Sequence, residues 1–533
     1  MFVFVHRPVP GALGAGASAL ILVAALGGHA IYRAGWLPRP AQPSVQTRRY
    51  DSSLYLLDIT TYSNWIPAPQ FSGGGIARWE DGLLFATGGG ELFVVRGIGD
   101  ATGLRINRLA YPIPLNIEDF KRGATELLKN TRGKTADYKR FRVTGILTVQ
   151  TGNHITLYAS HHYWDSANHC FALRVSTLSA ENAALEAGTA DAGWHTVFQS
   201  SPCLNLTING VKGKPFEGWE SGGRMALIND HELLLTVGDH GFDGVDRLPA
   251  LPQDMASSYG KIMLIPLNGG TPTLFSSGHR NPQGLLVTAD GTIWSTEHGP
   301  RGGDELNHIV NGANYGWPLV TLGVDYGNRI WPLNDKPGRH EGYVPPIYAF
   351  VPSVGISNLI TAPEQLFPAW AGDLLVGSLA KETLFRIRLL NGNVQFSEPI
   401  FIGDRIRDLT STHAGVVVIW TDDGNIITVK PRDESKAEKL LTACTACHSM
   451  NENDPSSTAP NLYGLINRRV ASRSDFGYSA AMKSFGGRWT RQRLDLFLTH
   501  PQNVVPGTIM QYPGIANADD RETIIDFLEN PPN

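Results

Sequence analysis

From about residue 53 to residue 430 the chain repeats one pattern of an apolar run, a turn containing Gly or Asp, and a second apolar run. Residues 77–85 (ARWEDGLLF) and 286–294 (LVTADGTIW) are examples. Such a pattern predicts a β-hairpin. The six turns lie at residues 81–82, 152–153, 229–230, 290–291, 372–373 and 423–424. Six recurring hairpins favour an all-β six-bladed β-propeller over residues 50–430, with a β-sandwich or a pair of barrels as the alternative.

The pattern changes after this region. A polar tract at residues 431–434 begins a linker that we place at 431–439. Ser435 and Glu438 have capping-box spacing, so a helix should begin there and carry Cys444 near its end. Ile524, Ile525 and Leu528 form an apolar stripe at helical spacing, which predicts a second helix packed against the first. Residues 440–533 should therefore form a small all-α domain.

The sequence CTACH at residues 444–448 carries a specific chemistry. Cys444 and Cys447 are three residues apart, so both thiols can bond one porphyrin, and the adjacent His448 can reach its iron. This predicts one covalently bound haem c. The alternative, a structural zinc site, needs about four protein ligands, and this region offers few.

Residues 505–515 (VPGTIMQYPGI) resemble the methionine loop of class I cytochromes c, and PNLYG at 460–464, Arg468, Tyr478 and Trp489 follow in that family's order. The resemblance implies a cytochrome c domain with Met510 as the second iron ligand. Met450 and Met482 are the alternatives. A His/Met pair leaves no open position on the iron, so this domain should carry electrons.

Three strings in the hairpin region resemble the soluble quinoprotein sugar dehydrogenases, which are six-bladed propellers that use pyrroloquinoline quinone (PQQ) and calcium. They are GHRNPQGL at 278–285, TEHGPRGGDELN at 296–307 and NYGWP at 314–318. The resemblance implies that Arg280 and Asn281 contact PQQ. It also implies that the main-chain carbonyls of Gly299 and Pro300 hold calcium against the quinone.

Further charged residues fit the same site. Arg405 and Arg407 are two apart on a predicted strand and so share a face, where paired guanidinium groups suit a tricarboxylated cofactor. Surface salt bridges are the alternative. Asp304 and Glu305 resemble ligands of a structural calcium ion, and a charged turn is the alternative.

The chain departs from the resembled family in two places. Ala380 stands where some members have a PQQ-binding lysine. Lys381 is one residue away, which on a strand faces the opposite side unless a bulge intervenes, and it is our candidate for the PQQ-binding lysine. Glu220, in the string ESGGR, stands where the family has its general base, a histidine. A carboxylate can take a substrate's hydroxyl proton, although its ordinary pKa makes it a weaker base. We expect Glu220 and Arg280 to form the catalytic pair.

Two functions follow. The first is a quinohaemoprotein dehydrogenase that oxidises a sugar or other alcohol and passes electrons to its own haem and then to the respiratory chain. The second is a non-catalytic propeller that serves as a binding or docking body for an electron-transfer cytochrome. The net charge of −4 gives no sign of a nucleic-acid partner.

Near the N-terminus, residues 11–32 contain no Asp, Glu, Lys or Arg, which is long enough for a transmembrane helix. We expect residues 1–40 to anchor the protein to the periplasmic face of the bacterial inner membrane. A cleaved signal peptide that releases a soluble periplasmic protein is the alternative. Cys170 and Cys203 remain after the haem cysteines, and they either form a disulfide in that oxidising compartment or stay as buried thiols.

Overall fold

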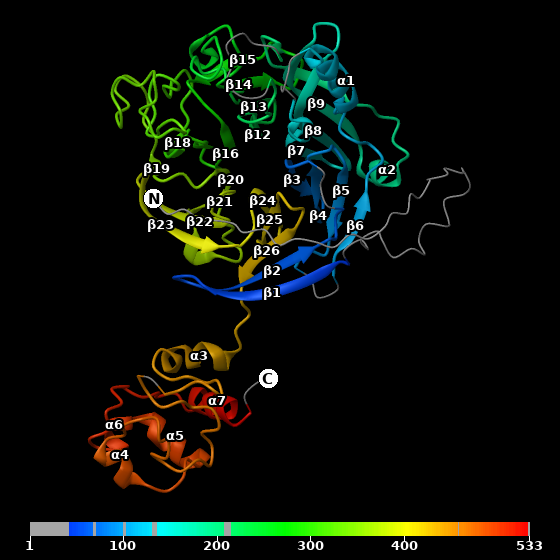
Figure 1. The fold of residues 1–533 in the computed structure, drawn as a ribbon. Helices are drawn as coiled ribbons and strands as arrows, with labels where there is room; N and C mark the ends of the chain where they lie inside the picture. Colours follow the sequence, from blue (N-terminus) through cyan, green and yellow to red (C-terminus); the bar gives the residue numbers. More distant parts are fainter. Residues whose placement is uncertain are drawn as a thin grey trace, which may run out of the picture.

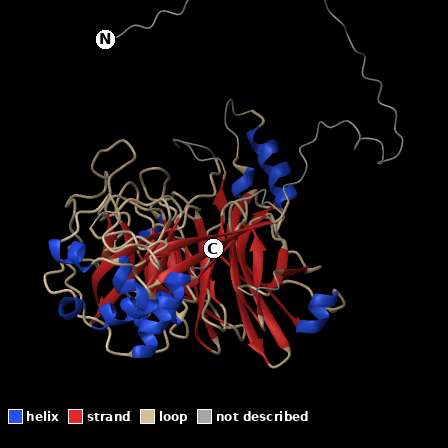
Figure 2. Ribbon diagram, turned by 90° about the horizontal axis from the view of Figure 1, so that it is seen from below, coloured by secondary structure: helices blue, strands red, loops and turns tan. Residues whose placement is uncertain are grey.

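The computed structural model describes residues 42–67, 71–99, 103–130, 136–206, 215–456 and 458–530. Strands fill the larger part and form a ring of antiparallel sheets (Figure 1), while helices dominate only after residue 435 (Figure 2). The arrangement confirms the six-bladed β-propeller.

Each blade is one sheet that runs from an innermost strand at the ring's centre to an outermost strand at its rim. In this order the first blade contains β3 (Gly74–Trp79), β4 (Gly82–Thr87), β5 (Leu92–Arg96) and β6 (Arg105–Arg108). The second contains β7 (Val143–Thr151), β8 (His154–Asp165), β9 (Cys170–Glu181) and β10 (His195–Gln199), with the short β11 (Leu204–Asn205) beside β9. The third contains β12 (Gly222–Asn229), β13 (Glu232–Val237), β14 (Lys261–Pro266) and β15 (Thr273–Ser277).

The remaining blades follow the same plan. The fourth contains β16 (Pro282–Val287), β17 (Ile293–Glu297), β18 (Asp304–His308) and β19 (Tyr348–Phe350). The fifth contains β20 (Ile356–Thr361), β21 (Leu374–Ser378), β22 (Thr383–Leu390) and β23 (Asn393–Phe401). The sixth contains β24 (Ile406–Ser411), β25 (Val417–Thr421), β26 (Ile426–Pro431), β2 (Leu56–Ser63) and β1 (Ser44–Asp51).

The ring is closed by the two ends of the propeller sequence. β2 pairs antiparallel with β26, so the sixth blade contains both the first and the last strands of the propeller. The six innermost strands β3, β7, β12, β16, β20 and β24 each contact the next around a central channel. Each of the six predicted turns falls in a different blade. The propeller begins at Ser44, earlier than the expected residue 50.

Each pair of neighbouring blades shares a hydrophobic core, which explains the continuous apolar runs in the sequence. Successive side chains of a strand point to opposite faces of its sheet. In β13, Leu233 and Leu235 therefore pack towards the second blade, and Leu234 packs towards the fourth. A strand that is buried on both faces has no polar face, so the blades are held together mainly by apolar contact.

The C-terminal domain is helical, as predicted. Its helices are α3 (Lys436–Thr445), α4 (Ala480–Phe485), α5 (Arg491–Thr499), α6 (Pro501–Val504) and α7 (Ala518–Glu529). Ser435 and Glu438 form the predicted capping box, so α3 begins inside the stretch 431–439 that we expected to be linker. α3 packs against α7, and Leu441, Ile524, Ile525 and Leu528 are buried in one core.

Three further features bear on the sequence predictions. Two helices, α1 (Ile117–Leu128) and α2 (Asn182–Ala187), lie at the edge of the propeller. Cys170 and Cys203 form a disulfide, which decides between the two alternatives. The predicted N-terminal anchor lies outside the described residues, and within the described residues we find no helix long and apolar enough to span a membrane.

Candidate functional site

The central channel contains a buried ion pair that joins blades on opposite sides of the ring. Arg224 on β12 is paired with Asp408 on β24, and their side chains are only 7% and 1% exposed. Arg224 also donates to the main-chain oxygens of Gln283 (2.9 Å) and Arg407 (2.8 Å). Asp408 accepts from the main-chain N–H of Ile76 at 3.0 Å. The pair thereby fixes the strands that carry the predicted site residues.

The predicted catalytic pair lies at one end of this channel. Glu220 lies two residues before the start of β12, and Arg280 lies two residues before the start of β16. The guanidinium of Arg280 is ion-paired with the carboxylate of Glu220 and donates to the main-chain oxygen of Gly299 at 2.9 Å. The backbone of Glu220 has a φ of 53°, and its oxygen accepts from His240 N–H at 3.1 Å. The structure therefore brings together two residues that are 60 apart in the sequence.

Asn281 also lies at this end. Its side-chain oxygen accepts from the side chain of Gln283 at 2.8 Å and from the N–H of Gly222 at 3.3 Å. Asn281 is buried. It therefore joins the loop before β16 to the loop that carries Glu220.

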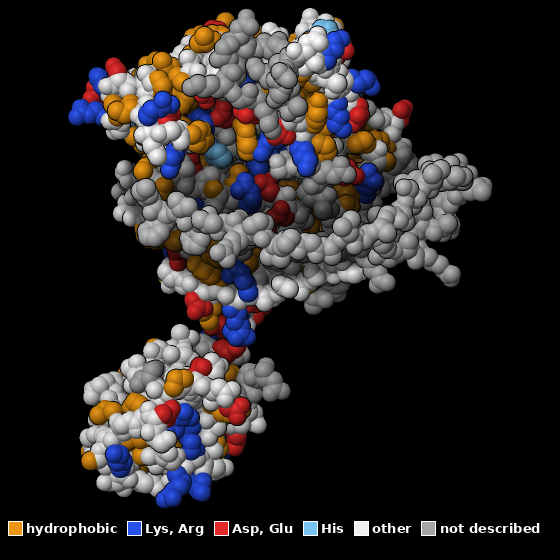
Figure 3. Space-filling view, in the orientation of Figure 1, with side chains coloured by type: hydrophobic (Ala, Val, Ile, Leu, Met, Phe, Trp, Pro, Cys, Tyr) orange, Lys and Arg blue, Asp and Glu red, His pale blue; other side chains and the backbone are white. Residues whose placement is uncertain are grey.

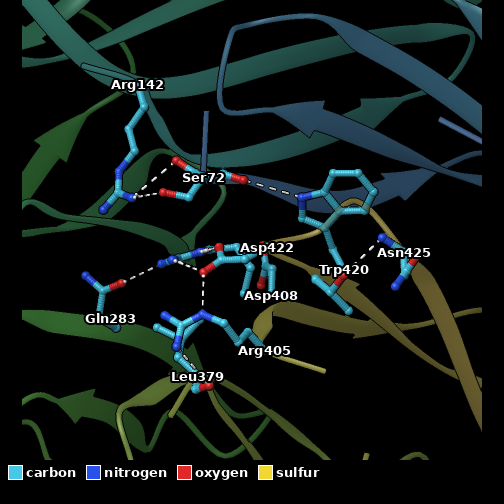
Figure 4. Close-up of polar contacts among 12 residues, drawn as sticks. Ser72, Arg142, Gln283, Leu379, Arg405, Asp408, Trp420, Asp422 and Asn425 are labelled. Atoms are coloured by element: carbon cyan, nitrogen blue, oxygen red, sulfur yellow. Dashed lines mark hydrogen bonds and ion pairs between the residues drawn. The ribbon is translucent and has the colours of Figure 1, made fainter. Parts of the chain in front are cut away.

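Arg405 and Arg407 converge on the carboxylate of Asp422, which Figure 4 shows beside Arg405. β24 begins at Ile406, and its ladder shifts register between Ile406 and Asp408, so the two arginines do not meet by sharing one face of a regular strand as predicted. Arg407 donates to both oxygens of Asp422, at 2.7 Å and 3.0 Å, and Arg405 donates to one of them at 3.1 Å. Burial raises the pKa of Asp422, but the charge and hydrogen bonds of Arg407 outweigh that effect and hold the pKa at about 2. Asp422 is therefore ionised at neutral pH and balances one of the two positive charges.

Arg142, which the sequence reasoning missed, is a buried cation in the same cluster (Figure 4). Its partners there are neutral: the side-chain and main-chain oxygens of Ser72 at 3.0 Å and 3.2 Å. Its buried Nε has no hydrogen-bond partner. Burial, and then the charge of Arg407, lower the pKa of Arg142 to about 9. A bound polycarboxylate would compensate this charge, so the arginine cluster fits PQQ.

Asp239 and Trp317 both contact Arg280 of the predicted catalytic pair. Trp317 donates from its indole nitrogen to Asp239 at 2.6 Å, and the guanidinium carbon of Arg280 lies 5.4 Å from the centre of the Trp317 ring. Burial, and then the nearby charge of Glu220, raise the pKa of Asp239 well above its ordinary value. Trp317 lies in the string at 314–318, whereas no sequence signal marked Asp239.

The residues expected to hold calcium have different surroundings. Asp304 accepts from the main-chain N–H groups of Val354, Gly355 and Ile356, at 2.7 to 3.2 Å, and so acts as a backbone anchor. Glu305 is buried and lines a cavity of about 10 Å³ with Glu297. Burial, and then the charge of Glu297, raise the pKa of Glu305 to about 8. A cation would relieve that repulsion, so Glu305 fits a calcium ion better than Asp304 does.

The remaining predicted residues of this site are Gly299, Pro300 and Lys381. The Gly299 carbonyl already accepts from Arg280, and Pro300 is buried next to it. Lys381 is exposed in the turn between β21 and β22, not on a strand. Among the described residues, one cluster of potential metal ligands is compact, Asp165 with Cys170 and Cys203, but its cysteines are joined in the disulfide.

The C-terminal domain encloses a cavity of about 420 Å³, lined mostly by apolar side chains. Cys444, Cys447, His448 and Met510 all face this cavity. The Nδ1 of His448 lies 2.6 Å from the main-chain oxygen of Pro460. Because that oxygen can only accept, Nδ1 carries the proton and Nε2 is free to bind iron. The side-chain amide of Gln502 donates to the main-chain oxygen of Met510 at 2.9 Å and so holds the loop that carries this methionine. The cavity and its donors fit a covalent haem.

Comparison with known proteins agrees with this division. The family described as Glucose / Sorbosone dehydrogenase matches residues 207–428. Quinoprotein glucose dehydrogenase B of Acinetobacter calcoaceticus is 25% identical over 312 residues, 44% of this chain and 65% of that protein. A cytochrome c homolog of Rickettsia typhi is 32% identical over 122 residues, 23% of this chain and 70% of that protein.

The chain is a fusion: its propeller matches the glucose/sorbosone dehydrogenase family over residues 207–428, and its C-terminal domain belongs to the cytochrome c family. The solved structure of the soluble aldose sugar dehydrogenase of Escherichia coli matches the propeller with a TM-score of 0.55 and 22% identity, and covers 70% of this chain and all of that one. This second likeness supports the propeller fold. The fusion protein spans less than two thirds of the Acinetobacter relative's length.

We predict that Met510→Ala leaves the haem covalently attached, removes the methionine-to-iron charge-transfer band and lowers the reduction potential, because a thioether favours ferrous iron. Visible spectra and a redox titration measure both effects. Met482→Leu, in the wall of the same cavity, is the control, since it keeps the volume without a thioether. Retention of the band in Met510→Ala would exclude Met510 as the ligand.

We predict that buried histidines make the fusion protein sensitive to acid. Burial is the main cause that lowers the pKa of His161 to about 4 and of His240 to about 3. Between pH 6.5 and those values the unfolded chain binds protons that the folded chain excludes, so stability falls as the pH falls.

The test of this prediction is the slope of unfolding free energy against pH. His240 lies among aromatic rings, and its Nε2 has no partner. His240→Phe should therefore reduce the slope by up to one proton, about 1.4 kcal/mol per pH unit. His231→Phe on an exposed turn is the control. Equal slopes in parent and His240→Phe would contradict the prediction.

Proposed function

We propose that the fusion protein is a quinohaemoprotein that oxidises a sugar or other alcohol with PQQ and calcium and delivers the electrons to its own haem. The observation that carries the proposal is the buried Arg142, with no carboxylate among its hydrogen-bond partners, beside Arg407 and Arg405. Such an excess of positive charge suits a ligand with several carboxylates. The names of the relatives, a quinoprotein glucose dehydrogenase and cytochromes c, agree with this chemistry.

The residues divide the work of an alcohol oxidation. The reaction turns a C–OH group into a carbonyl and releases two electrons and two protons. PQQ, when bound, would take the two electrons together with the C–H hydrogen, and the haem iron can receive electrons only one at a time. Glu220 would accept the hydroxyl proton, and Arg280 would orient the cofactor next to it. Glu305, with Glu297 beside it, would hold the structural calcium.

The pairing of Glu220 with Arg280 makes the base depend on the cofactor. In the structure the carboxylate of Glu220 is occupied by the guanidinium of Arg280. A cofactor carboxylate that engages Arg280 would compete with Glu220 for that guanidinium. Glu220 would then be released from the ion pair when the cofactor is bound, and its carboxylate would be free to contact the hydroxyl group of the substrate.

We predict that Glu220→Gln abolishes haem reduction by aldoses but retains PQQ. The amide keeps the shape of the side chain and cannot take a proton, so turnover should fall by about 100-fold or more. Purified full-length protein would be loaded with PQQ, with and without calcium, and haem reduction would be followed spectroscopically. Glu220→His should raise turnover and shift its pH dependence.

The control for this experiment is Glu232→Gln, the same chemical change at the opposite end of the β12–β13 hairpin. Parental turnover in Glu220→Gln would remove Glu220 from the role of base. If the parent protein retains no quinone spectrum with either addition, the propeller is instead a binding or docking body for the cytochrome.

We further propose that residues 11–32 anchor the protein in the bacterial inner membrane with both domains on the periplasmic side. The disulfide and the CTACH sequence support an oxidising compartment. The haem-stained protein should sediment with membranes and resist high salt but not detergent. Recovery of a soluble periplasmic form whose sequence starts after residue 30 would show that the segment is a cleaved signal.

A further inference from the structure

We propose that Trp219 is the platform on which the ring of a pyranose substrate stacks, next to Glu220. This inference deepens the proposed oxidation and rests on it. It takes the sugar as the substrate and assigns a role in binding it to a residue that the sequence analysis did not mark.

The exposure of Trp219 is unusual for this protein. Trp219 is 49% exposed, whereas Trp79, Trp164, Trp370 and Trp420 are almost completely buried. A large indole left in water forgoes the stabilisation that burial gives its apolar surface. Trp219 lies between Gly218, whose main-chain oxygen is 3.5 Å from the guanidinium of Arg142, and Glu220, which is paired with Arg280.

Trp219 is also held in place. The guanidinium carbon of Arg140 lies 3.1 Å from the centre of the indole ring, and Asp137 fixes Arg140 through an ion pair of 3.0 Å. Gly218 has a φ of 62°, and a Cβ there would lie 2.5 Å from the Cβ of Arg140. The main-chain oxygen of Gly218 accepts from the hydroxyl of Ser221 at 3.1 Å. One face of the indole is therefore covered, and the fixed loop leaves the other face to solvent.

This arrangement matches the two sides of a sugar. The C–H groups on one face of a pyranose can lie on an aromatic ring, and its hydroxyl groups need charged or polar partners close by. Glu220 and Arg280 supply those partners. A short linear alcohol has no flat face to stack and would gain little from Trp219.

The experiment compares Trp219→Ala, Trp219→Phe and the parent as full-length protein loaded with PQQ and calcium. Phe401→Ala, an exposed aromatic on the outer strand β23, is the matched control. Saturation-transfer NMR measures binding of glucose, and haem reduction gives kcat and KM for glucose and for glycerol. Trp219→Ala should raise the KM for glucose about tenfold with kcat within about twofold, and Trp219→Phe should restore most of the loss.

The glycerol values should not change in any variant. An unchanged KM for glucose in Trp219→Ala, or an equal loss in Phe401→Ala, would overturn the platform. If the parent binds glucose through Trp219 without reducing its haem, the platform stands and the proposed oxidation fails. If the parent shows neither binding nor haem reduction with glucose, both proposals are overturned.

Discussion

The buried pair of Arg224 and Asp408 is the constraint on which the site depends. It crosses the central channel and joins β12 to β24, and its hydrogen bonds reach β3 and the strand that follows Arg280. Removing one partner would leave an uncompensated buried charge, which costs about 3–5 kcal/mol. Apolar contacts hold neighbouring blades together, but they do not specify how the blade ends are aligned across the channel. The ion pair adds that alignment, and it brings the loops that carry Glu220, Arg280 and Arg407 to one end.

Charge balance at that end explains how the site is prepared for a ligand. Asp422 balances Arg407 and Arg405 only in part, and Glu220 balances Arg280. Arg142 has neutral hydrogen-bond partners and is buried. Burying a cation in this way is costly unless something compensates it, and the cost is offset when a polyanion binds.

The cytochrome domain follows a separate physical logic. Its cavity is apolar, and its polar groups serve to orient the ligands, since Pro460 fixes the tautomer of His448 and Gln502 fixes the loop of Met510. Across the face of the molecule in Figure 3, acidic and basic side chains are interspersed, in keeping with the small net charge. Fusion in one chain replaces a search between two proteins by an intramolecular encounter, which raises the effective concentration of the haem near the propeller.

The sequence by itself determined the blade number, the capping box at Ser435 and four of the residues that line the haem cavity. Those features are local: a hairpin turn, a helix cap and the spacing of CTACH each depend on a few consecutive residues. Local spacing did not decide how Arg405 and Arg407 meet, because Arg405 lies before β24 and both arginines are joined by the distant Asp422. It could not identify Arg142, Asp239 or Trp219, because their importance comes from neighbours that are distant in the sequence. Nor could it show that Asp304, predicted as a calcium ligand, accepts three backbone N–H groups of a distant segment. Only the closed ring decided which charges meet, because burial and ion pairing depend on the packing of all six blades.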